Sequence, residues 1–106
     1  KSAIATGIIL LLRNAGLEFE DIDALFLAGG FGNYLNVDNA MKIGLLPSQL
    51  KEKVIPLGNT AGTGALLAVN SVSFLDVLAS ILLKARHIEL SEDEDFPLEY
   101  AMNMNF

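Results

Sequence analysis

Two short apolar segments, each followed directly by a cluster of glycines, place the strongest constraint on the fold of this chain. The segments are residues 24–28 and 54–57, and the clusters are residues 29–33 and 58–64. The first segment is a continuous apolar run of the length typical of a strand buried on both faces. Glycine permits a positive φ and lets another group approach the backbone closely. The pattern therefore predicts two short strands that each end in a glycine turn, with Pro56 limiting the hydrogen bonding of the second strand.

Residues 2–15, ahead of the first strand, have the pattern of an amphipathic helix. Ser2 is expected to cap the amino end of this helix, and Gly16 is expected to terminate it. The helix spacing predicts one apolar face formed by Ile4, Ile8, Leu11 and Ala15. Leu17 to Asp23 then form an acidic connector to the first strand.

Helical patterns also follow each strand. Asn36 or Asp38 is expected to cap a short helix that ends near Gly44. Residues 61–86 predict a long helical segment that breaks near residues 70–71, and residues 97–102 predict a final short helix. Strands that alternate with helices indicate an α/β fold with a right-handed parallel β-α-β unit and flanking helices.

The predicted sheet is too small to bury its own surfaces. Two parallel strands leave both edges unpaired, and 52% of the residues are hydrophobic. The missing neighbours are expected to come from the parent protein or from a second copy, which allows a homodimer. Because the sequence starts at Lys1 inside a helical pattern without an initiator Met, residues 1–106 are interpreted as a single partial domain of a longer protein.

The first glycine cluster is the best candidate for a ligand site. Gly29 and Gly30 follow a strand, and open α/β sheets bind ligands at the carboxyl ends of their strands. Consecutive amides in such a turn can form a nest that binds anions. Phe31 is interpreted as a packing residue or as a contact to a base, and Asn33 as a turn residue or a polar contact. The alternative is that these glycines only make a tight turn.

The second glycine cluster is interpreted as a packing element. It lacks the Gly-Lys-[Ser/Thr] ending of a Walker A loop. Gly62 and Gly64 would let the following helix approach a neighbour closely, and Thr60 and Thr63 are interpreted as helix caps.

Composition argues against several other functions. The net charge of −6 disfavours binding to nucleic acids and anionic membranes, and no apolar run approaches the ~18 residues of a membrane span. A cytoplasmic location is expected. No catalytic or metal-binding residues are assigned: there is no Cys, His87 is the only His, and the acidic run at residues 92–95 is interpreted as a solvated surface.

Three linked segments resemble a known family. Residues 25–35, 40–47 and 57–65 are similar, in order, to the C-terminal ATPase domain of the reductive activators of corrinoid proteins. The resemblance covers nearly the whole chain. It implies a fragment of an actin-like (ribonuclease H-like) ATPase domain, in the superfamily of actin, sugar kinases and heat-shock chaperones, and it assigns this chain to the C-terminal part of that domain.

The resemblance also implies a function. Gly29 and Gly30 would line the adenosine part of ATP, with Phe31 and Asn33 nearer the base. Such activators use ATP to help reduce a cobalt(II) corrinoid protein to cobalt(I), with an electron from an iron–sulfur domain. The magnesium and phosphate sites and the iron–sulfur cluster would lie outside this segment, so the expected partners are the remainder of the ATPase domain and a corrinoid protein. The segment alone is not expected to be an active enzyme.

The alternative hypothesis is a non-catalytic assembly module. In that case the sheet edges and apolar helices would mediate dimerisation, and the glycines would serve only as turns.

Overall fold

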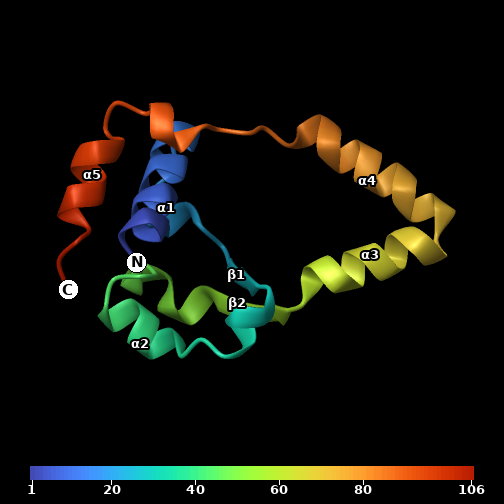
Figure 1. Ribbon diagram of the computed structural model, residues 1–106, viewed down its shortest axis with the longest axis horizontal. Helices are drawn as coiled ribbons and strands as arrows, with labels where there is room; N and C mark the ends of the chain where they lie inside the picture. The colour runs from blue at the N-terminus through green and yellow to red at the C-terminus, as the bar shows by residue number, and fades with distance from the viewer.

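The computed structural model describes residues 1–106, except for the side chains of Phe31 and Asn33. Helices and strands follow each other in the expected order (Figure 1). The helices are α1 (Ser2–Ala15), α2 (Val37–Lys42), α3 (Thr60–Asn70), α4 (Val72–Lys84) and α5 (Phe96–Met102), and the strands are β1 (Leu25–Ala28) and β2 (Val54–Gly58). Short 3-10 helices connect them: η1 (Phe19–Asp21), η2 (Gly30–Asn33), η3 (Ser48–Lys53) and η4 (Leu90–Glu92).

The two strands form a parallel pair, as predicted. Leu25 lies opposite Val54, and the register shifts after Leu27. Pro56 lies opposite Leu27 just before this shift, where the ladder is already irregular. The crossover between the strands contains α2, whose first turn is capped by Asn36 rather than Asp38, because the Asn36 side chain accepts a 2.9 Å hydrogen bond from the amide of Asn39.

Only one face of the strand pair is covered by the described chain. Ala40, Met41 and Leu46 are buried, and the inward side chains of the strands pack against them. On the opposite face, Phe26 is 58% exposed and Ile55 is 44% exposed. The prediction that the first strand is buried on both faces is therefore wrong for this chain, because a second covering layer is missing among the residues described.

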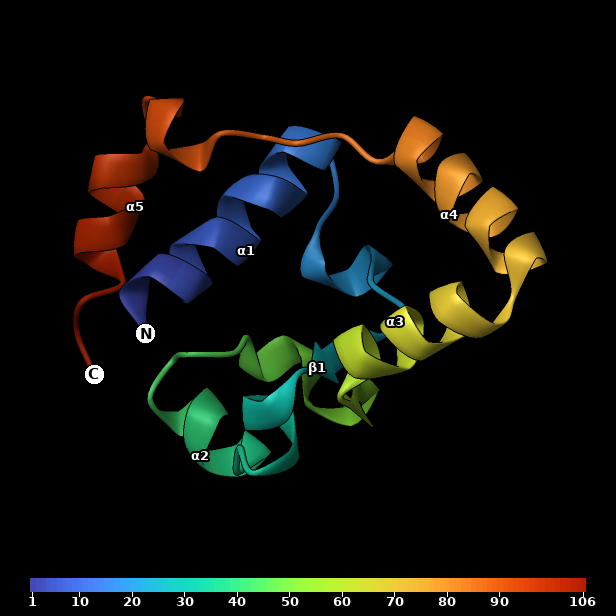
Figure 2. The same ribbon diagram turned by 45° about the vertical axis from the view of Figure 1, so that its right-hand side comes forward.

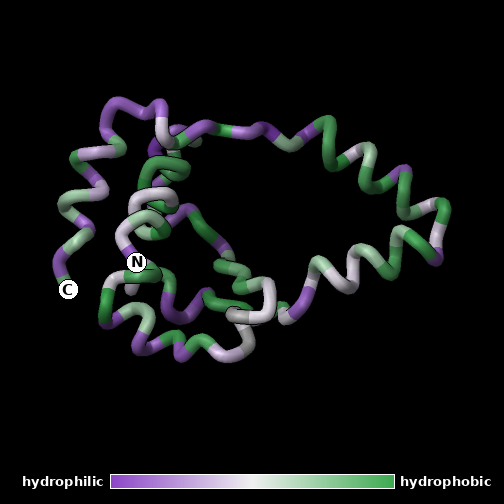
Figure 3. Tube along the Cα trace, in the orientation of Figure 1, coloured by the Kyte–Doolittle hydropathy of each residue, from purple (hydrophilic) through white to green (hydrophobic). Residues whose placement is uncertain are grey.

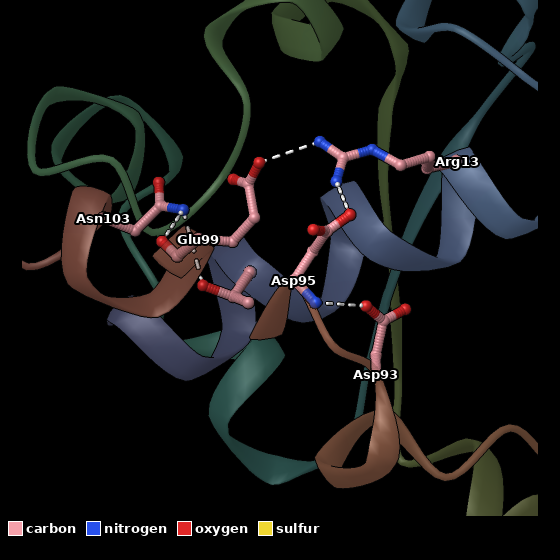
Figure 4. Close-up of polar contacts among 6 residues, drawn as sticks. Arg13, Asp93, Asp95, Glu99 and Asn103 are labelled. Carbon is pink, nitrogen blue, oxygen red and sulfur yellow. Dashed lines mark hydrogen bonds and ion pairs between the residues drawn. The ribbon is translucent and has the colours of Figure 1, made fainter. Parts of the chain in front are cut away.

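Helices α1 and α5 lie side by side although they are distant in sequence (Figures 1 and 2). Arg13 on α1 donates to Asp95 at 3.1 Å and to Glu99 at 2.8 Å (Figure 4). Ser2, which was expected to be the N-cap of α1, is its first residue, and its hydroxyl donates to the carbonyl of Asn103 at 3.0 Å. The acidic run that was interpreted as a solvated surface thus also contributes one ion pair, through Asp95, whose side chain is 61% exposed.

The buried side of α1 differs from the predicted face. Ile4 is 54% exposed and Leu11 is 45% exposed, whereas the buried residues are small ones and Leu10: Ala5, Thr6, Gly7 and Leu10. A Cβ added to Gly7 would lie 3.4 Å from Cδ1 of Leu90. Small side chains therefore let the C-terminal segment pack closely on α1, while Ile4 and Leu11 face outward. The expected terminator Gly16 is confirmed, with φ of +69°.

Helices α3 and α4 form an arm, here called the α3–α4 arm, that extends away from the rest of the chain (Figures 1 and 2). The predicted break is confirmed, since α3 ends at Asn70 and the Ser71 side chain caps α4. The arm is coloured as mainly hydrophobic in Figure 3, yet most of its large apolar side chains are exposed. Val69, Val72 and Leu83 are exposed by 84%, 83% and 89%.

The chain as a whole is extended. Its radius of gyration is 16.0 Å, against about 13 Å for a compact domain of this length. Its accessible surface is 7760 Å², about 2,000 Å² more than the ~5,800 Å² typical of a compact monomer of this mass. Among the helices that the structure describes, none combines the length and the apolar character needed to cross a membrane.

Candidate functional site

The glycine turns that follow β1 and β2 lie together at the carboxyl edge of the strand pair. The amide of Gly29 donates a 2.7 Å hydrogen bond to the carbonyl of Gly58. Both residues have a positive φ, +94° at Gly29 and +70° at Gly58, which L side chains rarely adopt. The hydrogen bond therefore fixes the first turn relative to the start of α3.

The glycines of the first turn are there for different physical reasons. Gly29 is required by its backbone conformation. Gly32 is required by packing, because a Cβ at this position would lie 3.1 Å from the carbonyl oxygen of Leu27. Gly30 has neither requirement: its φ is not positive, and an added Cβ would meet nothing within 4 Å. The structure of the described chain does not by itself explain why residue 30 has no side chain.

Two amides of the turn are already used within the chain. The amide of Gly29 is bonded to Gly58, and the amide of Gly32 donates to the carbonyl of Gly29 at 3.1 Å. An anion-binding nest built from all of the turn's amides is therefore not formed. The feature that the turn offers a ligand is close approach to the backbone at Gly30.

The backbone of Phe31 and Asn33 belongs to η2, but their side chains lie outside the described residues. Their expected contacts to a base therefore remain predictions. Tyr34 is not among the residues expected at this turn from the sequence, yet its side chain is 91% exposed directly after η2. Its place immediately after the glycine cluster is the signal that points to it.

The second glycine cluster caps α3 in a way that differs from the prediction. Asn59, not Thr60 or Thr63, is the N-cap, and its side-chain oxygen accepts from the amide of Gly62 at 3.0 Å. Gly62 is needed for this cap, since an added Cβ would lie 2.6 Å from Nδ2 of Asn59. A Cβ at Gly64 would meet nothing within 4 Å, so the close packing expected there involves no described part of this chain.

The ionisable groups with a clear pKa shift lie outside the two turns. A hydrogen bond from Lys51 lowers the pKa of Asp38, and the same bond raises the pKa of Lys51. A hydrogen bond to Glu99 raises the pKa of Arg13. Lys51 and Asp38 form an exposed pair at 2.8 Å, and Arg13 is half exposed although the Glu99 side chain is only 13% exposed. These pKa shifts therefore reflect ion pairing at the surface rather than a catalytic environment.

A fourth pKa shift occurs at Glu89, next to η4 and away from the glycine turns. The hydroxyl of Ser91 donates to the carboxylate of Glu89 at 2.6 Å and lowers the pKa of Glu89. Within the described residues, no group of three or more His, Cys, Asp or Glu side chains could hold a metal ion.

A cavity with both apolar and polar lining residues lies away from the glycine turns. It has a volume of about 240 Å³ and lies between α1 and the segment from α2 to η3. Apolar side chains such as Ile9, Met41 and Leu46 line it, together with the polar side chains of Gln49 and Asn103. It contains neither Gly29 nor Gly30. Its lining residues carry no charged side chain that could act as a general acid or base.

Comparison with known proteins identifies the family. The family model of the C-terminal domain of RACo, the ASKHA domain, matches residues 1–106. The chain belongs to this family. The mixed α/β fold with a short parallel strand pair and flanking helices, expected from the sequence as part of an actin-like domain, agrees with this assignment.

Two curated relatives of this ASKHA family member carry names that refer to corrinoid proteins. The chain is 42% identical over 106 residues to the corrinoid activation enzyme RamQ of Eubacterium limosum, covering 100% of this chain and 18% of the relative. It is 27% identical over 106 residues to the [Co(II) methylated amine-specific corrinoid protein] reductase of Methanosarcina barkeri, covering 98% of this chain and 19% of the relative. The chain thus spans about a fifth of the length of these relatives.

Proposed function

We propose that this chain is the adenosine-side nucleotide-binding portion of an ATP-dependent activator that helps to reduce cobalt(II) corrinoid proteins to cobalt(I). The chain would form the C-terminal part of the ATPase domain of a longer polypeptide. Membership of the ASKHA family and the names of the two relatives support this proposal.

The observation that carries the proposal is the unexplained glycine at position 30. Gly29 and Gly32 are accounted for by φ and by packing against Leu27, but Gly30 faces open space. A ligand that approaches the backbone at this point accounts for the absence of a side chain. The turn lies at the carboxyl end of a parallel strand, where α/β sheets place their ligands.

This segment would contact the nucleoside rather than the phosphates of ATP. The amides of Gly29 and Gly32 are committed to backbone carbonyls, so Gly30, with Phe31 and Asn33 nearer the base, would hold the adenosine. The phosphate and magnesium sites would be supplied by the remainder of the ATPase domain. ATP, when bound, supplies the free energy that helps the electron reach the corrinoid cobalt.

The electron would come from an iron–sulfur domain outside this segment, because the chain has no Cys to bind a cluster. The corrinoid protein would be the partner that accepts the electron, and its cobalt is the reacting centre. The proposed location of this reaction is the cytoplasm.

ATP titration of the full-length protein tests the proposal. Gly30→Val should fold normally, because an added Cβ meets nothing within 4 Å. It should weaken ATP binding by about tenfold or more, since the γ-methyl groups would hold the nucleoside off the backbone and 1.4 kcal/mol of lost contact suffices.

Ala15→Val is the matched control, because it adds the same branched side chain at an exposed position on α1. Its ATP affinity should equal that of the wild type. Unchanged ATP affinity in Gly30→Val would refute the adenosine-binding role of the turn.

A second candidate function, assembly through the α3–α4 arm, rests on a different observation. The arm exposes the large apolar side chains of both helices, and a groove along α3 is lined by Leu66 and Val69. The whole chain exposes about 2,000 Å² more surface than a compact monomer of its mass, which exceeds the roughly 800 Å² that each partner contributes to a standard interface. Asp76 and Lys84 are the only charged residues in the arm, a composition typical of a permanent interface.

Sedimentation of the full-length protein tests this second function. If the arm mediates dimerisation, Leu83→Glu should shift the protein from dimer to monomer, because the mutation places a charge in an apolar interface. Gln49→Glu adds the same charge at an exposed position outside the arm and should leave the dimer intact. A wild-type protein that sediments as a monomer would exclude assembly of this kind.

A further inference from the structure

The cavity between α1 and the segment from α2 to η3 is built from parts of the chain that are distant in sequence. Residues of α1, of η1, of the segment from α2 to η3 and of the end of α5 line it. Its floor is packed, because Ala5 and Met41 are each 9% exposed and Leu46 is 6% exposed. The cavity therefore depends on the folded arrangement of all four segments and not on one surface loop.

Small residues leave this space open. Ala5 is the cavity residue on the buried side of α1, and Gly44, with a φ of +70°, forms the wall where α2 ends. A cavity of 150 Å³ with apolar walls can hold benzene, so about 240 Å³ has room for one aromatic ring and a small substituent. Phe19 and the thioether of Met41 are walls that pack well against such a ring.

The cavity lies at the opposite end of the strand pair from the glycine turns. Phe19 belongs to η1, which precedes β1, and Gln49 belongs to η3, which leads directly into β2. The glycine turns follow the carboxyl ends of the same strands. A strand rises about 3.3 Å per residue, so β1 alone separates the two ends by roughly 13 Å. A ligand in the cavity would therefore not compete with one at Gly30.

The chemistry of the lining defines the ligand. The described lining residues carry no charge, although 19% of the chain is charged, and burial of an unpaired ion in such a site is costly. Asn103 donates through Nδ2 to the carbonyl of Glu99 at 2.8 Å and to Oγ1 of Thr6 at 3.4 Å (Figure 4). Asn103 thus offers a ligand its Oδ1 acceptor, and Gln49 offers its Nε2 donor. A hydroxyl group, which both donates and accepts, matches this pair.

We propose that this cavity is a binding site for a small uncharged aromatic alcohol, separate from the nucleotide site. The apolar walls bury the ring, and the amides of Gln49 and Asn103 bond to its hydroxyl. This inference does not depend on the proposed function, because none of the cavity residues belongs to the glycine turns.

Titration of the full-length protein with benzyl alcohol tests the proposal. The protein is labelled with ¹³C at the methionine methyl groups, and the Met41 signal is identified from its loss in Met41→Leu. This signal should shift saturably with benzyl alcohol, whereas the signal of Met102, which lies on α5 outside the cavity, should not move. Protonated benzylamine has the same ring but carries a charge, so its Kd should be at least about tenfold higher.

Two variants connect the response to the cavity. Ala5→Leu fills the space and should raise the Kd for benzyl alcohol at least about tenfold, whereas Ala3→Leu adds the same side chain at an exposed position on α1 and should bind like the wild type. Gln49→Ala guards against disturbed packing in Ala5→Leu, since Gln49 is exposed and its loss should leave the thermal midpoint unchanged. Loss of one hydrogen bond should raise the Kd about 2-fold to 10-fold.

The outcomes separate this proposal from the nucleotide site. A saturable Met41 shift that is equal with and without ATP, and weakened in Ala5→Leu and in Gln49→Ala, would support it. A shift that grows linearly without saturation, no shift at all, or wild-type affinity in both variants would overturn it. Competition between ATP and benzyl alcohol would overturn the separate site, whereas a wild-type protein that binds no ATP would overturn only the proposed function.

Discussion

The glycines of the first turn allow stability and ligand binding to be separated by single substitutions. Gly29→Ala forces a side chain into a φ of +94°, which costs about 1–2 kcal/mol for a left-handed conformation. Gly32→Ala places a Cβ 3.1 Å from the carbonyl oxygen of Leu27 and should cost about 1–3 kcal/mol through overpacking. Gly30→Ala meets neither obstacle and should stay within about 0.5 kcal/mol of the wild type.

Hydrogen exchange of residues 25–35 in the full-length protein measures these differences. A loss of 1–2 kcal/mol raises the fraction of locally open molecules by about 5-fold to 30-fold, so the amides of β1 should exchange faster by this factor in Gly29→Ala. The exchange of Gly30→Ala should match the wild type, even though ATP should protect the turn less in this variant. Equal acceleration in Gly30→Ala and Gly29→Ala would show that the space at Gly30 is not free, and the argument for a ligand there would fail.

Three further predictions concern contacts outside the turn. Arg13→Ala removes the ion pairs to Asp95 and Glu99, so the amides of α5 should exchange with solvent faster than in the wild type. This difference in exchange rate should shrink at 1 M salt, which screens the ion pairs. Unchanged exchange would mean that the ion pairs do not hold α5. In Lys51→Met the pKa of Asp38, followed by NMR, should rise toward its ordinary value. Pairing with Lys51 lowers the pKa of Asp38 in the folded protein. The pair therefore stabilises the fold above the ordinary pKa of Asp38, and this stabilisation is lost as the pH falls through the folded pKa. The wild type should thus lose more stability in acid than Lys51→Met. Asn59→Ala removes the cap of α3 and should destabilise that helix by about 0.5–2 kcal/mol, detected as faster exchange in its first turn; a wild-type rate there would assign the cap to another group.

Local signals in the sequence predicted most of the elements. The apolar runs indicated β1 and β2, Gly16 and Gly44 marked helix ends through their positive φ, and the polar pair at residues 70–71 marked the break between α3 and α4. These features depend on the propensities of a few neighbouring residues. The parallel pairing of the strands followed from the alternation of strands and helices.

The errors concern which surfaces are covered, because burial depends on residues far away in the sequence. Helical spacing favoured Ile4 and Leu11 as the inner face of α1, but the C-terminal segment packs on the small residues instead, where Gly7 lies against Leu90. Phe26 was expected to be buried, but no described residues form a layer over its side of the strand pair. At the candidate site, the glycine turn was visible in the sequence, whereas the difference between Gly30 and its neighbours needed atomic geometry.

The contact between α1 and the C-terminal segment also determines the order in which the chain can fold during synthesis. Arg13 and Asp95 are separated by 82 positions, and Thr6 and Asn103 by 97. At about 5–20 residues per second, α1 would wait roughly 5–20 s on the ribosome before its partner is made. Thr6, which is 0% exposed in the folded chain and accepts a hydrogen bond from Asn103, would lack this partner throughout the interval. Within this segment, α1 is thus made before the residues that pack on it, and its side facing α5 stays open to other chains until they follow.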